Sequence, residues 1–359
     1  LVYGFNILEK FILSTILLFI KPNIKYNKFN KFNTLLKPSK LISPISDAEL
    51  FEYIKKYVPR SFLEISRLKH NFFISCKDKV ILGSGSSLLN DKEKFKLLLF
   101  RELGGKIISV QHGSAYGDAS VSIHHGHEYL FDKFISWGQT SHQNYRTKFV
   151  PLPSPQLRNK TNYHKIKSKK NILFVSTSNM FVQPKYLKMR SFNESCKRIR
   201  NSYIFLKSIK AKDHSKIFYK DSPYGHFSEK NIFEKQFKKI IFINKKPEQF
   251  INNVKLIVMN NYSTFFFKSL SMNIPTILIC EKNCWDSTSK AKKLFGVLHN
   301  AGIVNYNPKK AAKRVEDNLL EWWYSKKTQK ARKLFCNEFA LSDKNTFKTW
   351  LNFFLNHKL

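Results

Sequence analysis

Apolar and polar positions alternate along the first half of the chain in a pattern typical of strands and helices that follow one another. Strands are expected at Lys79–Leu82, Lys106–Val110 and Lys133–Trp137, and a helix is expected at Lys92–Leu103, after two helical stretches between residues 47 and 68. Strands that alternate with helices favour a parallel sheet, because each parallel connection needs a crossover. The first half is therefore predicted to form an α/β lobe.

The same alternation starts again after residue 170. The second set of expected strands is Asn171–Ser176, Lys216–Tyr219, Ile240–Ile243, Leu256–Met259 and Thr276–Cys280, with helices near 191–210, 247–253, 264–272 and 288–295. After Pro308 a helical pattern continues to the end of the chain and carries Trp322, Trp323 and Trp350. The simplest interpretation of Trp322 and Trp323 is an apolar helix face that packs on a lobe, and stacking on a sugar is the alternative.

A proline-rich stretch, Val150–Pro155, separates the two sets of strands, and a basic segment follows it. The predicted organisation is an N-terminal apolar and basic segment (1–46), an N-terminal Rossmann-like lobe (47–155), a linker (156–170), a C-terminal Rossmann-like lobe (171–307) and a C-terminal helical tail (308–359). Open parallel sheets bind ligands beyond the carboxyl ends of their strands. A site is therefore expected in an interdomain cleft between the lobes.

The formal net charge is +38, from 63 Lys and Arg against 25 Asp and Glu. Compositional drift is the favoured cause of this excess, since Lys, Asn, Ile and Phe are all used heavily. An anionic partner is the alternative: a nucleic acid, an acidic lipid surface or a phosphorylated substrate. A hydrophobic content of 42% with 15% aromatic residues argues against a disordered chain. The five cysteines are scattered, so neither a zinc site nor a disulfide framework is indicated, and a cytoplasmic location is expected.

Phe11–Ile20 is an apolar run of ten residues. It is shorter than the roughly 20 residues that span a bilayer. No small-residue cleavage site follows it, so a core or interfacial helix is favoured over a signal peptide. An interfacial helix beside the basic segment favours a peripheral position at the inner face of the cytoplasmic membrane. Because the chain begins with Leu1, upstream sequence is expected, and the first lobe is expected to be truncated.

Gln111-His112-Gly113 directly follows the strand that ends at Val110. His112 is thus expected at the carboxyl end of a strand, where a neutral imidazole can accept a proton from an acceptor hydroxyl. Gly113 and Gly117 allow unusual backbone angles and the close approach of a ligand. The alternative for His112 is a structural histidine in a turn.

Asn261-Tyr262-Ser263-Thr264 lies between a buried strand and the start of a helix. Free backbone N–H groups and hydroxyls at a helix start form an anion site, so this turn is interpreted as a phosphate cradle. The alternative is an ordinary helix cap, for which Ser and Thr are common choices.

Three further motifs are weaker candidates. The loop His124-His125-Gly126-His127-Glu128 is favoured as a polar loop over a metal cluster. Gly83–Ser87 lacks the lysine of a P-loop and the third glycine of a dinucleotide fingerprint, so a plain turn is expected. Lys216 and Lys220 flank a strand of the second lobe, where a cation could neutralise a leaving phosphate; a solvated lysine is the alternative.

Several short motifs, in order, resemble a family of transferases encoded with O-antigen and other surface-carbohydrate genes. The matching segments are Gln111–Gly113 with Tyr116–Gly117, Ser136–Gly138, Pro151–Pro155, Asn261–Thr264 with Asn273–Thr276, Ala301–Ile303, Ala311–Ala312, Trp322–Trp323 and Ala331–Arg332 with Phe335. They span roughly residues 47 to 350. A more distant similarity is to the CDP-glycerol glycerophosphotransferases.

The resemblance implies a GT-B-like fold and a metal-independent glycosyltransferase. Such an enzyme moves a sugar or sugar-like group from a nucleotide-activated donor to a bacterial surface glycan or lipid-linked acceptor. By this analogy His112 is the base or a phosphate ligand. The donor- and phosphate-binding residues expected beside it are Gly113, Tyr116, Gly117, Lys220, Asn261, Tyr262, Ser263 and Thr264. The nucleotide-activated sugar is the substrate, and neither a cofactor, a metal nor a nucleic-acid partner is expected.

Two departures from the family pattern leave other functions open. Lys268 stands where the family tends to have an acid that holds the donor ribose, and the family's Arg in the strand before Tyr224-Gly225 is missing, with Lys216 or Lys220 as substitutes. A degenerate, non-catalytic transferase fragment is therefore one alternative. A polyanion-binding or nucleic-acid-binding protein is the other, although the chain has no nucleic-acid module.

Overall fold

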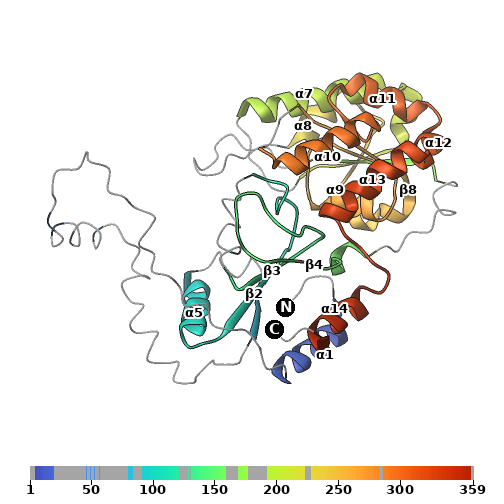
Figure 1. Ribbon diagram of the computed structural model, residues 1–359. Helices are drawn as coiled ribbons and strands as arrows, with labels where there is room; N and C mark the ends of the chain where they lie inside the picture. The colour runs from blue at the N-terminus through green and yellow to red at the C-terminus, as the bar shows by residue number, and fades with distance from the viewer. Residues whose placement is uncertain are drawn as a thin grey trace.

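The computed structural model describes residues 5–19, 46, 49, 52, 56, 80–83, 91–120, 128, 131–158, 169–176, 192–222, 228–282 and 286–356. In this part of the chain the strands form two parallel sheets, each in its own lobe (Figure 1). We call these the N-lobe and the C-lobe. Apart from Glu49, Glu52 and Lys56, which are helical, the helices expected between residues 47 and 68 lie outside the described residues, as does most of the expected linker.

The N-lobe sheet has four parallel strands in the order β1-β2-β3-β4. They are β1 (Val80–Gly83), β2 (Lys106–Val110), β3 (Lys133–Ser136) and β4 (Phe149–Pro151). The helices of this lobe are α1 (Ile7–Phe19), α5 (Asp91–Glu102) and α14 (Thr346–Asn356). Trp350 of α14 and Phe5 share a core with Ile108 and Val110 of β2. This packing holds β2, the strand that ends at Val110, two residues before His112.

The C-lobe sheet has six parallel strands in the order β10-β9-β8-β5-β6-β7. They are β5 (Asn171–Val175), β6 (Ile217–Lys220), β7 (Ile241–Ile243), β8 (Val254–Met259), β9 (Thr276–Ile279) and β10 (Val304–Asn305). The order reverses between β5 and β8, which is the doubly wound arrangement. The residues of β8 are almost all apolar, because helices cover both faces of the sheet.

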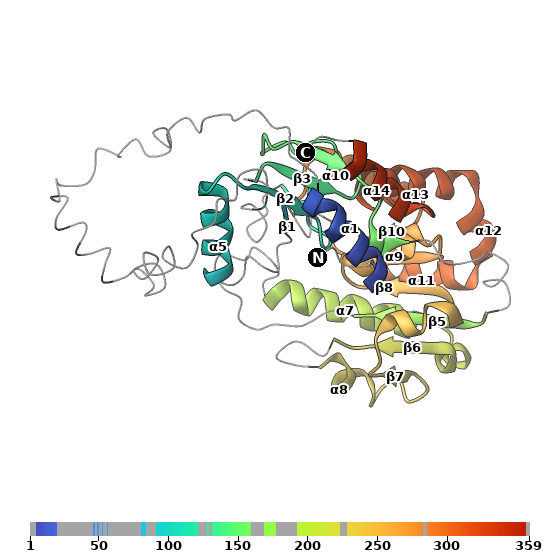
Figure 2. The same cartoon turned by 90° about the horizontal axis from the view of Figure 1, so that it is seen from below.

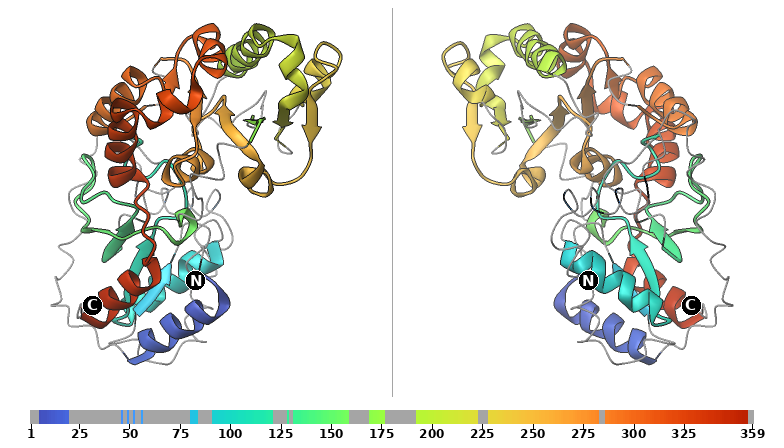
Figure 3. Two further views of the ribbon diagram at one scale, coloured as in Figure 1. Left: turned by 90° about the vertical axis from the view of Figure 1, so that its right-hand side faces the viewer. Right: turned by 90° about the vertical axis from the view of Figure 1, so that its left-hand side faces the viewer.

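Two helical layers cover the C-lobe sheet (Figure 3). α7 (Phe192–Ser208) and α11 (Pro308–Glu316) pack on one face, and α9 (Thr264–Ser271), α10 (Ser289–Asn300) and α13 (Lys326–Phe339) pack on the other. The shorter elements are α8 (Glu229–Phe233), α12 (Leu319–Tyr324) and the 3₁₀ turns Pro155–Leu157, Ala211–Lys216, Pro247–Gln249 and Ile251–Asn253. Trp137 and Leu157 of the N-lobe belong to the core beneath α9 and α13, so the two lobes share buried apolar contacts.

The C-terminal tail consists of four helices, α11 to α14, and returns to the N-lobe. After α13, the Leu341 N–H donates to Trp137 O at 2.9 Å, and Leu341 O accepts from the Ser154 N–H at 2.8 Å. Trp350 Nε1 then donates to Pro153 O at 2.8 Å. As a result, the first and last described helices, α1 and α14, lie side by side in one lobe (Figure 2).

Two parallel-sheet lobes with a C-terminal helical tail confirm the GT-B-like fold class expected from the sequence. Three local expectations were wrong. β4 lies within the stretch interpreted as the break between the lobes, and Pro151 is tolerated because β4 is an edge strand. No strand was expected at β10, because its two residues are too few to give a periodic pattern. The helix expected near 247–253 is a pair of 3₁₀ turns.

Trp350→Ala is expected to lower the free energy of unfolding by about 3–5 kcal/mol, because it empties a fully buried site and removes the bond to Pro153. Urea unfolding followed by circular dichroism checks this. Leu355→Ala on the same helix is the matched control, since Leu355 is 60% exposed, and its effect should stay within about 0.5 kcal/mol. Equal effects of the two substitutions would contradict the docking of α14.

Candidate functional site at the junction of the lobes

The loop after β2 and the turn after β8 touch each other across the lobes. The Ser114 N–H donates to Thr264 Oγ1 at 3.0 Å, a contact between residues 150 positions apart. A Cβ atom on Gly113 would lie 3.0 Å from the same oxygen, so the side chain of any other residue would crowd it. The two motifs singled out in the sequence are therefore direct neighbours in space.

Gly117 sits in the left-handed region at this junction. Its φ is +67°, and a Cβ atom there would come within 2.7 Å of the Gln139 side chain. Its carbonyl oxygen accepts from Thr288 Oγ1 of the C-lobe at 3.1 Å. Gly117 is thus required for the path of the loop, both by its backbone angle and by the close approach of Gln139.

Asp118 and Tyr262 form a buried hydrogen bond between the lobes. Tyr262 Oη donates to Asp118 Oδ2 at 2.6 Å, and Asp118 is 1% exposed. Burial raises the pKa of the Asp118 carboxyl from its ordinary value of 3.8 to about 7, although the bond from Tyr262 opposes the rise. Burial and the Asp118 charge also raise the pKa of Tyr262 well above its ordinary value. The charged form of the Asp118 carboxyl is therefore disfavoured at this contact between the lobes.

His112 follows β2 and is half-buried. Its Nδ1 lies 2.5 Å from Tyr116 Oη, and its carbonyl oxygen accepts from Gln156 Nε2 at 3.2 Å. Tyr116 Oη in turn donates to Glu128 Oε1 at 2.6 Å. Both Tyr116 and Glu128 are fully buried, so the imidazole is held from behind by a polar chain inside the N-lobe.

Ser263 and Asn261 flank the start of α9 on the C-lobe side of the junction. Both are half-buried, and Ser263 makes no capping bond to the helix through its side chain. The first amide groups of a helix lack intrahelical acceptors. Ser263 Oγ and these amides can therefore donate to an anion, whereas Thr264 Oγ1 already accepts from Ser114 and keeps its own proton to donate.

The lysines singled out in the sequence are paired within the protein. Lys220 Nζ donates to Asn244 O at 3.1 Å, and Lys216 Nζ lies 2.5 Å from Asp213 Oδ1. Lys268, in the position of the family's acid, lies 3.7 Å from a carboxylate oxygen of Glu248. None of the three is brought to the His112 turn by a hydrogen bond or ion pair among the described residues.

A buried polar cluster supports the point where the C-lobe strand order reverses. Asn260 Nδ2 donates to Ser176 Oγ and to Ser202 Oγ, both at 3.0 Å. Ser176 Oγ donates to Glu229 Oε2 at 2.6 Å, and the same carboxylate oxygen accepts from Tyr219. Asn260 immediately precedes the candidate phosphate turn, so this cluster fixes the direction in which that turn leaves β8.

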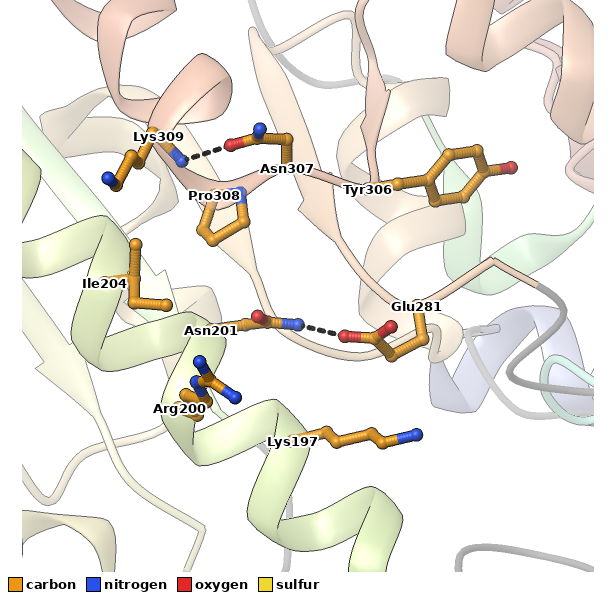
Figure 4. A pocket seen from close by; sticks show the side chains of 9 residues that line it. All are labelled: Lys197, Arg200, Asn201, Ile204, Glu281, Tyr306, Asn307, Pro308 and Lys309. Carbon is orange, nitrogen blue, oxygen red and sulfur yellow. Dashed lines mark hydrogen bonds between the residues drawn. The ribbon is translucent and has the colours of Figure 1, made fainter.

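A cation-lined pocket of about 540 Å³ lies in the C-lobe between α7 and the loops after β9 and β10 (Figure 4). Lys197, Arg200 and Lys309 line it together with one carboxylate, Glu281. Asn201 Nδ2 donates to Glu281 Oε1 at 2.6 Å and orients it. The Asn307 side chain caps α11 and satisfies its first amides. The lining therefore suits an anionic ligand through its side chains rather than through a helix start.

Several expected site elements lie outside the described residues. They are His124 to His127, residues 84–87 of the glycine–serine turn, and residues 223–227 with Tyr224 and Gly225. Glu128 is described. Its Oε2 accepts from Ser109 Oγ at 2.7 Å, and its Oε1 accepts from Tyr116 Oη. No group of three potential metal ligands occurs among the described residues.

Neither Asp118 nor the role of Glu128 as the partner of Tyr116 was predicted from the sequence. One signal could have pointed to them. Residues 107–132 contain no Lys or Arg, although 63 of the 359 residues, more than one in six, are Lys or Arg. A long stretch without cations in such a chain indicates a buried segment, and acids inside it need partners.

Comparison with known proteins gives a family match over almost the whole chain. The model of the LIC12162 family transferases matches residues 8–354. None of the curated proteins matches the chain.

Three solved structures are similar over most of the chain. MurG of Acinetobacter baumannii shares 10% identity, covers 90% of this chain and 83% of its own, and has a TM-score of 0.46. A variant of the wall teichoic acid polymerase TagF shares 11%, covers 70% and 68%, and has a TM-score of 0.42. WaaG, a glycosyltransferase involved in lipopolysaccharide biosynthesis, shares 11%, covers 83% and 96%, and has a TM-score of 0.37. Similarities this distant transfer no site residue to the chain.

The free energy of unfolding is expected to fall as the pH rises from 3.8 to about 7, because Asp118 ionises at different pH values in the unfolded and the folded chain. In the unfolded chain this carboxyl ionises near pH 3.8, whereas in the folded chain it ionises near 7. The folded state therefore binds the proton more tightly, and stability is lost between these two values and is then constant. Asp118→Asn removes this ionisation. The free energy of unfolding of the variant, taken relative to that of the unsubstituted protein, should therefore be roughly 3 kcal/mol higher at pH 8 than at pH 5.

Thermal unfolding at pH 5 and pH 8 measures this difference. Asp317→Asn, at an exposed position after α11, is the matched control and should change neither value. A constant difference between Asp118→Asn and the unsubstituted protein at both pH values would contradict the raised pKa.

Proposed function

The chain belongs to the LIC12162 family of transferases, and from this premise we propose that it is a glycosyltransferase of bacterial surface-glycan biosynthesis. It moves a sugar or sugar-like group from a nucleotide-activated donor to a glycan or lipid-linked acceptor. One observation carries the proposal beyond the family level: the His112 turn of one lobe lies against the start of α9 in the other, joined by the bond from Ser114 to Thr264. This juxtaposition supports a base next to a phosphate site.

In the proposed reaction an acceptor hydroxyl attacks the donor carbon that is bonded to a phosphate oxygen. The hydroxyl proton passes to His112, and the bond between that carbon and the phosphate oxygen breaks. Ser263, Thr264 and the first amides of α9 stabilise the leaving phosphate, as preorganised donors do for developing negative charge. Gly113, Tyr116, Gly117, Asn261 and Tyr262 shape the two turns. The scheme requires neither a metal nor a cofactor.

Neutralisation of the leaving group needs a cation as well. Lys220 can supply it only by leaving Asn244 O. The pocket with Lys197, Arg200 and Lys309 offers a second set of cations on the same lobe. We therefore include this pocket in the proposed donor region, as the place for an anionic part of the donor or acceptor.

A nucleotide sugar is expected to raise the melting temperature, because a ligand that binds only the folded state stabilises it by mass action. With the most stabilising nucleotide sugar as donor, His112→Gln should lower the rate of nucleotide release by about 10²–10⁴-fold, since a general base contributes that much. A thermal-shift screen followed by a turnover assay measures both effects.

His299→Gln is the matched control, because His299 lies in α10, bonded to Val304 O and remote in sequence from both turns. An unchanged rate for His112→Gln would assign His112 to structure alone. Stabilisation by RNA or heparin but by no nucleotide sugar would favour the polyanion-binding alternative.

We also propose that the enzyme works at the inner face of the cytoplasmic membrane. No described helix is long and apolar enough to cross a membrane. α1, however, exposes three large apolar side chains, Ile7 (87%), Leu8 (66%) and Phe11 (68%). Next to the lysine-rich residues 21–40, this surface supports a shallow contact with anionic lipid, where a lipid-linked acceptor is found.

Binding to anionic vesicles at low salt and its loss at high salt are expected in liposome flotation, because each surface Lys or Arg contributes about 1 kcal/mol. Replacing Lys25, Lys28 and Lys31 by Gln should abolish binding, and Ile7→Ser with Phe11→Ser should weaken it. Replacing the exposed C-lobe residues Lys326, Lys327 and Lys330 by Gln controls for net charge. If the protein does not float at low salt, the membrane proposal is wrong.

A further inference from the structure

A continuous chain of polar side chains runs from the interior of the N-lobe to the His112 imidazole. Ser109 Oγ of β2 donates to Glu128 Oε2 at 2.7 Å. Tyr116 Oη lies 2.6 Å from Glu128 Oε1 and 2.5 Å from His112 Nδ1. Ser109, Tyr116 and Glu128 are each 0% exposed. None of these three side chains is exposed to bulk solvent, so their polar atoms need partners inside the protein.

The donors and acceptors along this chain of side chains determine which ring nitrogen of His112 carries the proton. Ser109 Oγ and Tyr116 Oη each donate their proton to a different oxygen of the Glu128 carboxyl group. A tyrosine hydroxyl has a single proton. Once Tyr116 donates it to Glu128, its oxygen can only accept from His112. Nδ1 must then carry the N–H, and in the neutral ring the lone pair is on Nε2.

We propose that Tyr116 and Glu128 are positioning residues that hold His112 in the tautomer with the proton on Nδ1. This inference rests on the proposed function in one respect, namely that His112 is the base. It adds which ring nitrogen of His112 accepts the proton, and which residues select that nitrogen. Without the chain, a histidine in water favours the opposite tautomer, whose Nε2 already carries a proton and cannot accept another.

The same chain stabilises the product of proton transfer. The acceptor O–H proton moves to Nε2, and the oxygen uses the released electron pair to form the new bond to the donor carbon. The pair of the broken carbon–oxygen bond leaves with the nucleotide phosphate. The imidazolium then donates through Nδ1 to Tyr116, whose hydroxyl is polarised by the Glu128 carboxylate. The buried Glu128 carboxylate, which is two hydrogen bonds away from the ring, thus compensates the new positive charge on His112.

The tautomer can be measured directly by ¹⁵N–¹H correlation spectroscopy of the histidine side chains in the full chain, with His112→Gln to assign the signal. The unsubstituted protein is expected to show His112 with its proton on Nδ1. Tyr116→Phe removes the acceptor and should give a mixture that contains the Nε2–H form. Tyr145→Phe, at a tyrosine that packs against His142 in the same lobe, is the matched control and should leave the His112 signal unchanged.

Turnover separates positioning from simple folding. Tyr116→Phe should lower the rate about 10- to 100-fold, the size found for outer partners of metal-bound histidines. Glu128→Gln keeps an oxygen for Tyr116, so it should preserve the tautomer yet lower the rate, because the compensating charge is gone.

The two proposals fail in different ways. An Nε2–H proton on His112 in the unsubstituted protein overturns the positioning chain, whether or not the enzyme is active. An Nδ1–H proton together with a reaction rate that His112→Gln does not change leaves the positioning chain standing and overturns the proposed base.

Discussion

The buried bond between Asp118 and Tyr262 is the constraint on which the arrangement of the two lobes depends. A carboxyl group that is 1% exposed must find a donor, because an unpaired buried acid costs several kcal/mol. The donor it finds lies 144 positions away, in the other lobe. The loop after β2 is therefore complete only against the C-lobe, and the same docking brings Ser114 to Thr264.

The loop meets this constraint through its composition. It contains no lysine or arginine in a chain that otherwise uses them heavily, since a buried cation without a partner would be costly. Glycine occupies two positions where the loop passes close to other groups, Gly113 against Thr264 and Gly117 against Gln139. Two of its acids are paired with tyrosines: Asp118 with Tyr262, and Glu128 with Tyr116. These contacts support the described residues around His112 from both lobes, which is what a positioned base requires.

The tail and the shared core reinforce the same junction. Trp137 follows β3 of the N-lobe yet packs against Phe267 of α9, with ring centroids 6.4 Å apart. Its carbonyl oxygen receives the Leu341 N–H as the tail passes back to the N-lobe. The helical tail thus links both lobes, and α14 completes the N-lobe core through Trp350. Relative movement of the lobes would have to break apolar packing and hydrogen bonds together.

The sequence by itself determined most of the strands and helices, although it gave neither β4 nor β10 and it predicted a helix where two 3₁₀ turns lie. Periodicity locates β2 to the residue and β5 to within one, because a buried strand between polar turns is a local signal. Parallel sheets place their active loops at the strand ends, so His112 and the turn at Ser263 could both be singled out. Only the tertiary structure decided what these residues touch. Bonds such as those of Asp118 to Tyr262 and Ser114 to Thr264 join positions about 150 residues apart and leave no periodic trace. The partner of Tyr116 and the return of α14 to the first lobe depend in the same way on packing, which a one-dimensional pattern does not contain.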